Sequence, residues 1–167
     1  MYYIVMGVSG CGKSSIGAGF AKAIGAQFLD GDDLHPAENV AKMAAGQALN
    51  DEDRAPWLAD VGRAFHGAKG DMVIGCSALK RAYRDIIRQA AAGPVTFLHL
   101  HGEKAVIAAR MQAREDHFMP PALLDSQFAT LEWPDKDETA ISVNIDQTPE
   151  AIIAALVGQT RRPFAGK

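Results

Sequence analysis

Short apolar runs alternate along this chain with longer segments in which apolar residues recur at helical spacing. Five of the apolar runs predict buried strands, because they are four to six residues long and rich in Val, Ile, Leu and aromatic residues. They cover residues 2–6, 27–30, 72–76, 95–100 and 141–145. Strands that alternate with helical patterns are typical of repeated βαβ units, so the pattern predicts an α/β fold on a mostly parallel sheet.

The helical segments between the strands carry start and stop signals. A helix is expected at about 14–24, directly after the first strand. Another is expected after the third strand, with Ser77 as its N-cap and Gly93 as its stop. Its apolar stripe consists of Leu79, Tyr83, Ile86, Ile87 and Ala90. Thr148 predicts the start of a last helix that ends near Gly158.

Length and composition bound the class of protein. The 167 residues fit a single domain over 1–167, and 48% hydrophobic with 22% charged residues is ordinary for a globular chain. A net charge of −3 argues against a nucleic-acid partner or a membrane-lipid surface, which would need a basic excess. Two cysteines make no disulfide framework, and the apolar N-terminal run is too short to span a bilayer. We therefore expect a soluble, cytoplasmic protein.

Two polar stretches interrupt the alternation of strands and helices. One covers about 32–67 and the other about 114–137, and both contain proline. Long inserts in a compact α/β domain are usually binding segments or active-site lids. We expect the first to be a substrate-binding insert and the second a lid.

The turn after the first strand carries a complete phosphate-loop motif. Gly7 to Ser14, GVSGCGKS, matches G-x-x-x-x-G-K-[ST] at every fixed position, between a predicted strand and a predicted helix. Glycines let successive backbone N–H groups point at phosphate oxygens, and the helix N-terminus adds positive charge. Lys13 would reach the β- and γ-phosphates of ATP, and the Ser14 hydroxyl would bind Mg²⁺. The expected nucleotide-binding residues are Gly7, Val8, Ser9, Gly10, Cys11, Gly12, Lys13, Ser14 and Ser15.

Carboxylates follow the second predicted strand. Asp30 and Asp32 are two residues apart, so in an extended chain both would point towards the phosphate loop. One could hold Mg²⁺ and the other could accept the proton of an attacking hydroxyl. The third strand ends in Cys76 and Ser77 without the usual Walker-B carboxylate, which favours Asp30 for the metal. The alternative is an ordinary polar turn.

Basic and polar residues close behind these carboxylates, and others at the start of the helix after the third strand, are candidates for binding a second, anionic substrate. The candidates are His35, Lys42, Arg54, Lys80 and Arg84. Arginine is favoured because its planar fork grips a carboxylate with two hydrogen bonds. Taken singly, a cation of this kind is more often an ordinary surface charge.

Further candidates lie around the predicted lid. Arg110 and Arg114 end the helix that follows the fourth strand, and His117 lies in the lid itself. An arginine supplied by a closing lid could neutralise charge on the transferring phosphoryl group, which makes Arg114 a candidate catalytic residue. His117 could pack the lid onto the substrate.

Four blocks of the chain together resemble the small P-loop gluconokinases, the thermoresistant type. The blocks are GVSGCGKSS, DGDDLHPAENVAKMAAGQALNDEDRAPWL, CSALKRAYRD and HFMPPALLDSQFATLE, in order over about 1–132. The resemblance implies a nucleoside-monophosphate-kinase-like, three-layer α/β sandwich with a five-stranded parallel sheet, an insert and a lid. It also implies transfer of the γ-phosphoryl of ATP to the 6-hydroxyl of D-gluconate, and homodimers are common in the family.

Shikimate kinases look like cousins of that family. Their paired aspartates imply Asp30 for Mg²⁺ and Asp32 for the acceptor hydroxyl. The same likeness implies that Arg110 stacks on adenine, that Arg114 reaches the phosphates, and that 144–149 lies near the adenine ring. A kinase for another small anion, such as shikimate or a nucleoside monophosphate, is the nearest alternative. A non-catalytic ATP-binding switch is a further one.

Overall fold

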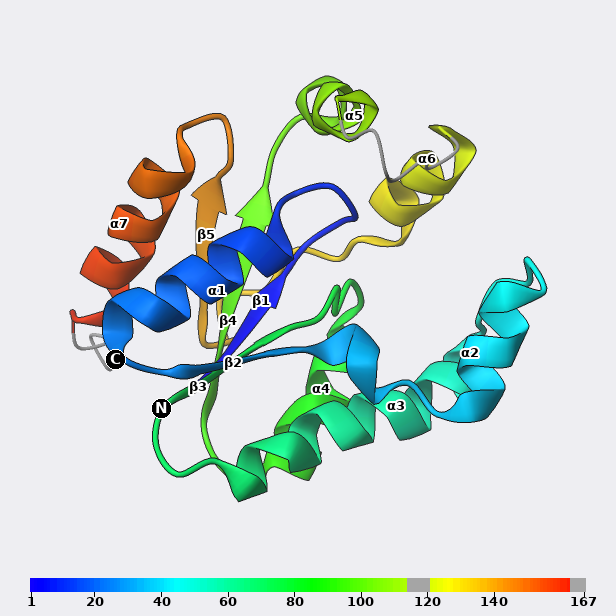
Figure 1. Ribbon diagram of the computed structural model, residues 1–167, viewed down its shortest axis with the longest axis horizontal. Helices are drawn as coiled ribbons and strands as arrows, with labels where there is room; N and C mark the ends of the chain where they lie inside the picture. The colour runs from blue at the N-terminus through cyan, green and yellow to red at the C-terminus, as the bar shows by residue number, and fades with distance from the viewer. Residues whose placement is uncertain (114–120, 163–167) are drawn as a thin grey trace.

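The computed structural model describes residues 1–113 and 121–162, and they are built around one parallel sheet (Figure 1). Its strand order is β2-β3-β1-β4-β5, and every neighbouring pair is parallel. The strands are β1 (Tyr2–Met6), β2 (Gln27–Asp30), β3 (Met72–Gly75), β4 (Val95–His101) and β5 (Ala140–Asn144). This confirms the predicted five-stranded parallel α/β fold.

Helices cover both faces of the sheet and make three layers. Figure 1 shows α1 and α7 side by side on one face, and α3 and α4 together on the other. The helices are α1 (Lys13–Ile24), α2 (Ala37–Ala44), α3 (Asp51–Ala64), α4 (Arg81–Ala91), α5 (Lys104–Gln112), α6 (Pro121–Thr130) and α7 (Pro149–Thr160). Two 3₁₀ turns, η1 (Gly31–Leu34) and η2 (Phe65–Gly67), flank the stretch that holds α2 and α3.

The core follows from the alternation of side chains along the buried strands. In β1, Tyr3 and Val5 join the cluster beneath α1 and α7, while Ile4 and Met6 join the cluster beneath α3 and α4. Both faces of a parallel sheet are covered in such folds, so its strands are apolar throughout. The central strand therefore places the phosphate loop, which follows Met6, at the middle of the sheet edge.

The boundaries of two helices differ from the prediction. Helix α4 begins at Arg81 with Lys80 as its N-cap, not at Ser77. Residues 77–80 instead belong to no helix, and Ala78 adopts a left-handed backbone with φ of 45°. At its far end Ala92 (φ 52°) makes the left-handed turn, one residue before the predicted stop at Gly93. Helix α7 continues to Thr160, two residues beyond the predicted end.

Across 1–113 and 121–162, the longest helices fall short of the length and apolar character that a membrane crossing requires.

Candidate active site

The phosphate loop joins the end of β1 to the start of α1, and its glycines are needed for its shape. Gly7 has a φ of 145°, and a Cβ there would lie 2.5 Å from the carbonyl oxygen of Leu100. Gly12 caps α1 with a φ of 93°. The Lys13 ammonium donates to the carbonyl oxygens of Gly7 and Val8, at 3.0 and 3.1 Å, and so lies folded over the loop.

Asp30 ends β2 beside this loop. Its Oδ2 accepts a hydrogen bond from the Ser14 hydroxyl at 3.2 Å, and its Oδ1 accepts one from the backbone N–H of Asp32 at 3.0 Å. The second bond belongs to the turn η1, so the expectation of an extended chain from Asp30 to Asp32 is wrong. An aspartate readily caps a turn in this way. Both carboxylates nevertheless line one cleft together with Lys13 and Ser14.

Asp32 has the electrostatics of a proton acceptor. Its carboxylate is 79% exposed, yet the surrounding cleft walls and, next, the charge of Asp30 raise its pKa above the ordinary value. Removal from bulk water and a neighbouring like charge both disfavour the ionised form. A carboxylate whose pKa is raised is a stronger base towards a substrate hydroxyl.

A stacked aromatic pair lies next to the Asp32 carboxylate. The ring of His35 stacks on the indole of Trp57 at 4.0 Å, and the Trp57 Nε1–H donates to the carbonyl oxygen of Gly31 at 2.8 Å. His35 Nε2 lies 3.9 Å from Asp32 Oδ1. Burial lowers the pKa of His35. The charge of Arg54 lowers that pKa further, whereas the charge of Asp32 opposes the shift. Trp57 thus belongs to the core and also lines the cleft.

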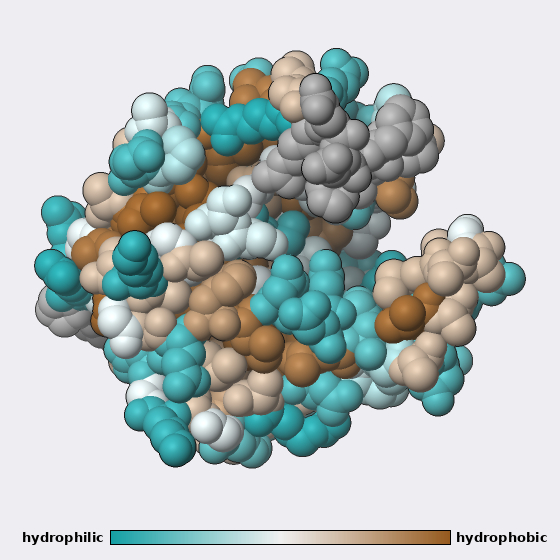
Figure 2. Space-filling view, viewed as in Figure 1, coloured by the Kyte–Doolittle hydropathy of each residue, from teal (hydrophilic) through white to brown (hydrophobic). Residues whose placement is uncertain are grey.

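The cleft itself has a volume of about 560 Å³ and opens to solvent. In Figure 2 the surface is hollowed on the side next to α2. The walls come from the phosphate loop, from the ends of β2 and β3, from α3, and from α6 through Leu123 and Gln127. Segments far apart in the sequence therefore meet where parallel strands end, the usual ligand site of such sheets.

Of the four basic candidates for the second substrate, Arg54 lines the cleft. Its Nη1 donates to the Tyr83 hydroxyl at 3.3 Å and lies 3.6 Å from a carboxylate oxygen of Asp51. Lys80 pairs with the same Asp51 at 3.2 Å, and Lys42 pairs with Asp53 at 2.6 Å, both outside the cleft lining. Arg54 is thus held by its neighbours with its side chain in the cleft.

Arg84 does not face the cleft, contrary to the expectation from its position after the third strand. The side chain is fully buried, and its Nε and Nη2 donate to Glu138 at 2.7 and 3.0 Å. Its Nη1 donates to the carbonyl oxygens of Ala78 and Leu79. Burial opposes ionisation of Glu138, but hydrogen bonds from Arg84 and Arg88 outweigh it and lower the pKa of that carboxyl to about 2.

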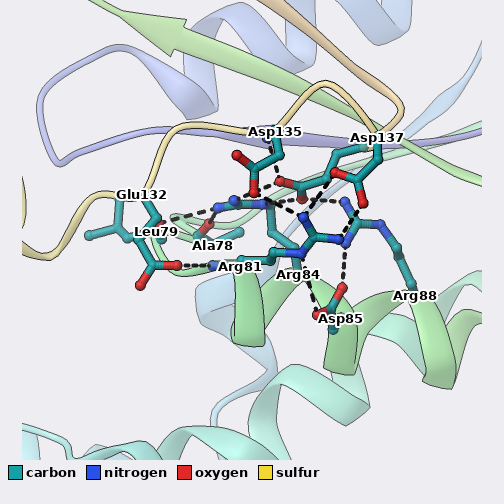
Figure 3. A network of polar contacts seen from close by, with 10 residues as sticks. Ala78, Leu79, Arg81, Arg84, Asp85, Arg88, Glu132, Asp135 and Asp137 are labelled. Carbon is teal, nitrogen blue, oxygen red and sulfur yellow. Dashed lines mark hydrogen bonds and ion pairs between the residues drawn. The ribbon is translucent and has the colours of Figure 1, made fainter.

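Figure 3 shows this network, in which arginines of α4 meet the acidic segment before β5. Arg84 ties two segments of the fold together, because a buried guanidinium must have every donor paired. Its spacing along α4 could not reveal this, since the partner Glu138 lies 54 residues away.

The remaining predicted site residues lie around α5 and α6. Arg110 Nη2 donates to the carbonyl oxygen of Ile145 at 2.6 Å and lies 3.5 Å from that of Gln147. It thus adjoins the 144–149 segment that was expected near the adenine ring. Arg114 and His117 lie outside the described residues.

Sequence reasoning missed Gln127 on α6. Its Oε1 accepts from the backbone N–H of Ser9 at 2.6 Å, and its Nε2 donates to the Ser9 hydroxyl at 2.9 Å. No local spacing could point to this pair, because 118 residues separate its members. The block that contains Gln127 supported the resemblance, but no residue in it carries a phosphate-binding signature by itself.

Comparisons with known proteins show the family of this chain. A family model described as an AAA domain matches residues 3–134. A gluconokinase of Gluconobacter oxydans is 45% identical, over 93% of this chain and 89% of its own. The thermoresistant gluconokinase of Escherichia coli is 43% identical, over 93% and 90%.

Solved structures give the same result. The crystal structure of a gluconokinase from Sinorhizobium meliloti superposes with a TM-score of 0.86 at 46% identity, over 96% of this chain and 91% of that one. A shikimate kinase of Aquifex aeolicus shares the fold at 11% identity, with a TM-score of 0.59. With a phosphate loop, strand-end aspartates and relatives this similar over nearly its whole length, the chain belongs to the gluconokinase family of P-loop kinases.

Proposed function

We propose that this protein transfers the γ-phosphoryl group of ATP to the 6-hydroxyl of D-gluconate, giving 6-phospho-D-gluconate and ADP. The observation that carries the proposal is the single cleft that brings together the phosphate loop, Asp30, Asp32 and Arg54. That combination supplies a phosphate cradle, a proton acceptor and a cation for an anionic acceptor. The names of the relatives support gluconate as the acceptor.

The nucleotide end of the cleft would hold ATP through the loop amides and the ammonium of Lys13. For the adenine we propose the surface between Arg110 and the 144–149 segment. The two hydrogen bonds of Arg110 hold its side chain against that segment. Backbone amides suit phosphate because they are fixed donors that need no reorganisation during transfer.

Mg²⁺ would be held by the Ser14 hydroxyl and Asp30. Their oxygens lie 3.2 Å apart, close to the roughly 3 Å between adjacent ligands of an octahedral ion with bonds of about 2.1 Å. Among the residues that the structure describes, no group of three or more His, Cys, Asp or Glu could hold a metal alone. Two protein oxygens with phosphates and water suit Mg²⁺, which would offset negative charge on the transferring group.

At the acceptor end, Asp32 would take the proton of the 6-hydroxyl as that oxygen bonds to the γ-phosphorus. The bond from the γ-phosphorus to the bridging oxygen breaks at the same time, and its electron pair leaves with ADP. Arg54 would bind the gluconate carboxylate through its planar fork, and His35 would contact the sugar-acid chain. Lys42, Lys80 and Arg84 are left out of this set, because none of the three lines the cleft and Arg84 is buried against Glu138. Arg114 and His117 stay predictions.

An acceptor panel tests the substrate assignment. ADP release is measured with D-gluconate, shikimate, a nucleoside monophosphate and no acceptor. We expect turnover with gluconate and little with the rest. Turnover with shikimate or a nucleotide but not with gluconate would reject the assignment, and ADP release independent of any acceptor would favour an ATP-dependent switch.

Replacing Asp32 tests the mechanism. Asp32→Asn keeps the shape of the side chain but removes the proton acceptor, so we expect kcat to fall about 10²- to 10⁴-fold. ATP binding, measured by calorimetry, should change little. Asp33→Asn is the matched control, because Asp33 is exposed and outside the cleft lining. Equal losses in both variants would argue against a base at position 32.

A cytoplasmic location and a homodimer also remain proposals. Two buried cysteines suit a reducing compartment. Analytical ultracentrifugation at assay concentration measures the oligomeric state.

A further inference from the structure

The contact between Gln127 and Ser9 joins α6 to the phosphate loop. Both ends of the carboxamide are used: Oε1 accepts from the Ser9 N–H, and Nε2 donates to the Ser9 hydroxyl. These two hydrogen bonds together fix the orientation of the Gln127 amide group. The two residues line the same cleft as Lys13 and Asp32.

The backbone N–H of Ser9 donates to a side chain, whereas the N–H groups of two other loop residues donate to backbone carbonyl oxygens. The Gly7 N–H donates to the carbonyl oxygen of Ser77 at 3.2 Å, and the Cys11 N–H donates to that of Val8 at 3.3 Å. Those acceptors are main-chain groups that shape the loop. The acceptor for Ser9 is a side chain from another element, which can rotate away without unfolding the loop.

The chemistry of the two possible acceptors makes them competitors. A phosphate oxygen and the Gln127 Oε1 both accept, and a single N–H donor aligns well with one of them at a time. Ser9 lines the same cleft as Lys13, Ser14 and Asp32. A triphosphate held by the loop would therefore bring its terminal phosphoryl group close to the Ser9 amide. We infer that Gln127 is a positioning residue that holds the Ser9 amide until the γ-phosphate displaces it.

The displacement couples the occupancy of the loop to α6. That helix carries Leu123 and Gln127 to the cleft wall and is anchored in the core through Leu124. Among the described residues, Lys104 makes two further contacts with α6: an exposed ion pair with Asp125 and a contact of its ammonium with the Phe128 ring, 5.7 Å from the centroid. Release of Gln127 by a triphosphate therefore frees the cleft-facing side of α6, whereas a diphosphate leaves it bound to Ser9.

This inference rests on the proposed function only in that ATP binds the loop, so its test leaves gluconate out. The affinities of ADP and of a non-hydrolysable β,γ-imido analogue of ATP are measured by calorimetry on the full chain. In Gln127→Ala the competitor is gone, and we expect the analogue to bind about 3- to 10-fold more tightly with ADP changed less than 2-fold. In Gln127→Glu the carboxylate still accepts from Ser9 and repels phosphate, so the analogue should bind about 10-fold more weakly.

The opposite signs separate this role from a structural one, which would weaken binding in both variants. Ser126→Ala, one residue away on the same helix and exposed, is the matched control and should leave both affinities unchanged. Gln127→Asn, too short to reach Ser9, replaces the alanine variant if that one does not fold. Equal or parallel changes in the variants would overturn the inference, whereas a wild-type protein that binds neither nucleotide would instead refute the proposed function.

Discussion

At the scale of single residues, the cleft depends on how each cation is paired. Arg54, Lys42 and Lys80 are equivalent as positive charges in the sequence. In the structure the two lysines pair with Asp53 and Asp51 outside the cleft lining, while Arg54 is held by the Tyr83 hydroxyl and by Asp51 and lines the cleft. A cation fixed in this way loses less entropy when it binds a carboxylate.

Arg54→Met should therefore raise the KM for gluconate about 10- to 100-fold, since it removes a charge-assisted hydrogen bond. The KM for ATP should change little, because Arg54 belongs to the acceptor end of the cleft. Steady-state kinetics with each substrate varied in turn measures both values. Arg63→Met is the control on the same helix, since Arg63 is exposed and pairs with Asp60. Equal effects on the two substrates would count against the carboxylate role.

At the scale of elements, the packing of α3 on α4 holds together the part of the cleft that we propose for the acceptor. Helix α3 carries Arg54 and Trp57, and α4 carries the Tyr83 that steadies Arg54. The two helices approach closely at Gly62, where a Cβ would lie 2.6 Å from the carbonyl oxygen of Ile87 and 2.7 Å from the Cβ of Ala90. Only a residue without a side chain fits this crossing.

Gly62→Ala should lower the free energy of unfolding by about 1–3 kcal/mol, because backbone atoms must shift to admit the methyl group. Gly158→Ala makes the opposite case: nothing lies within 4 Å of a Cβ there, and the residue is inside α7. That change should stabilise by about 0.5–1 kcal/mol, since alanine favours helix. Denaturant titration of both variants checks the signs, and a stabilised Gly62 variant would contradict the close crossing.

At the scale of the whole molecule, a buried histidine links folding to pH. His99 is 1% exposed on β4, and its ring nitrogens have no hydrogen-bond partner among the described residues. Burial, followed by the charges of His101 and Arg84, lowers its pKa from 6.5 to about 4. The unfolded chain therefore binds more protons than the folded chain between pH 4 and 6.5, and stability falls as the pH falls through that window.

His99→Leu should flatten this dependence, because the leucine side chain does not titrate. One proton is worth roughly 1 kcal/mol per pH unit, so the difference between variant and wild type should be measurable from pH 6.5 to 5. Urea titrations at several pH values give the slopes. His66→Leu is the control, because His66 is exposed. His35 and His101, whose pKa values are also lowered by burial, should leave a residual slope in the His99 variant. The His66 variant should keep the slope of the wild type. Unchanged slopes in the His99 variant would refute the assignment.

The success of sequence reasoning depended on the range of the interaction. The strands, the phosphate loop and the position of Asp30 follow from local periodicity and from a contiguous motif, and all five strands lie where the pattern predicts them. Arg84 shows the opposite case. Its position in the first helical turns after the third strand suggested the cleft, whereas a distant carboxylate, Glu138, holds it in the interior.

By itself the sequence determined the fold class, the phosphate-binding loop and the family, because each depends on residues that are neighbours along the chain. Tertiary structure alone decided which cation lines the cleft and that Gln127 meets Ser9. These are pairings between distant segments that the sheet edge brings together. Their free energy comes from burial and from partners that no local pattern contains.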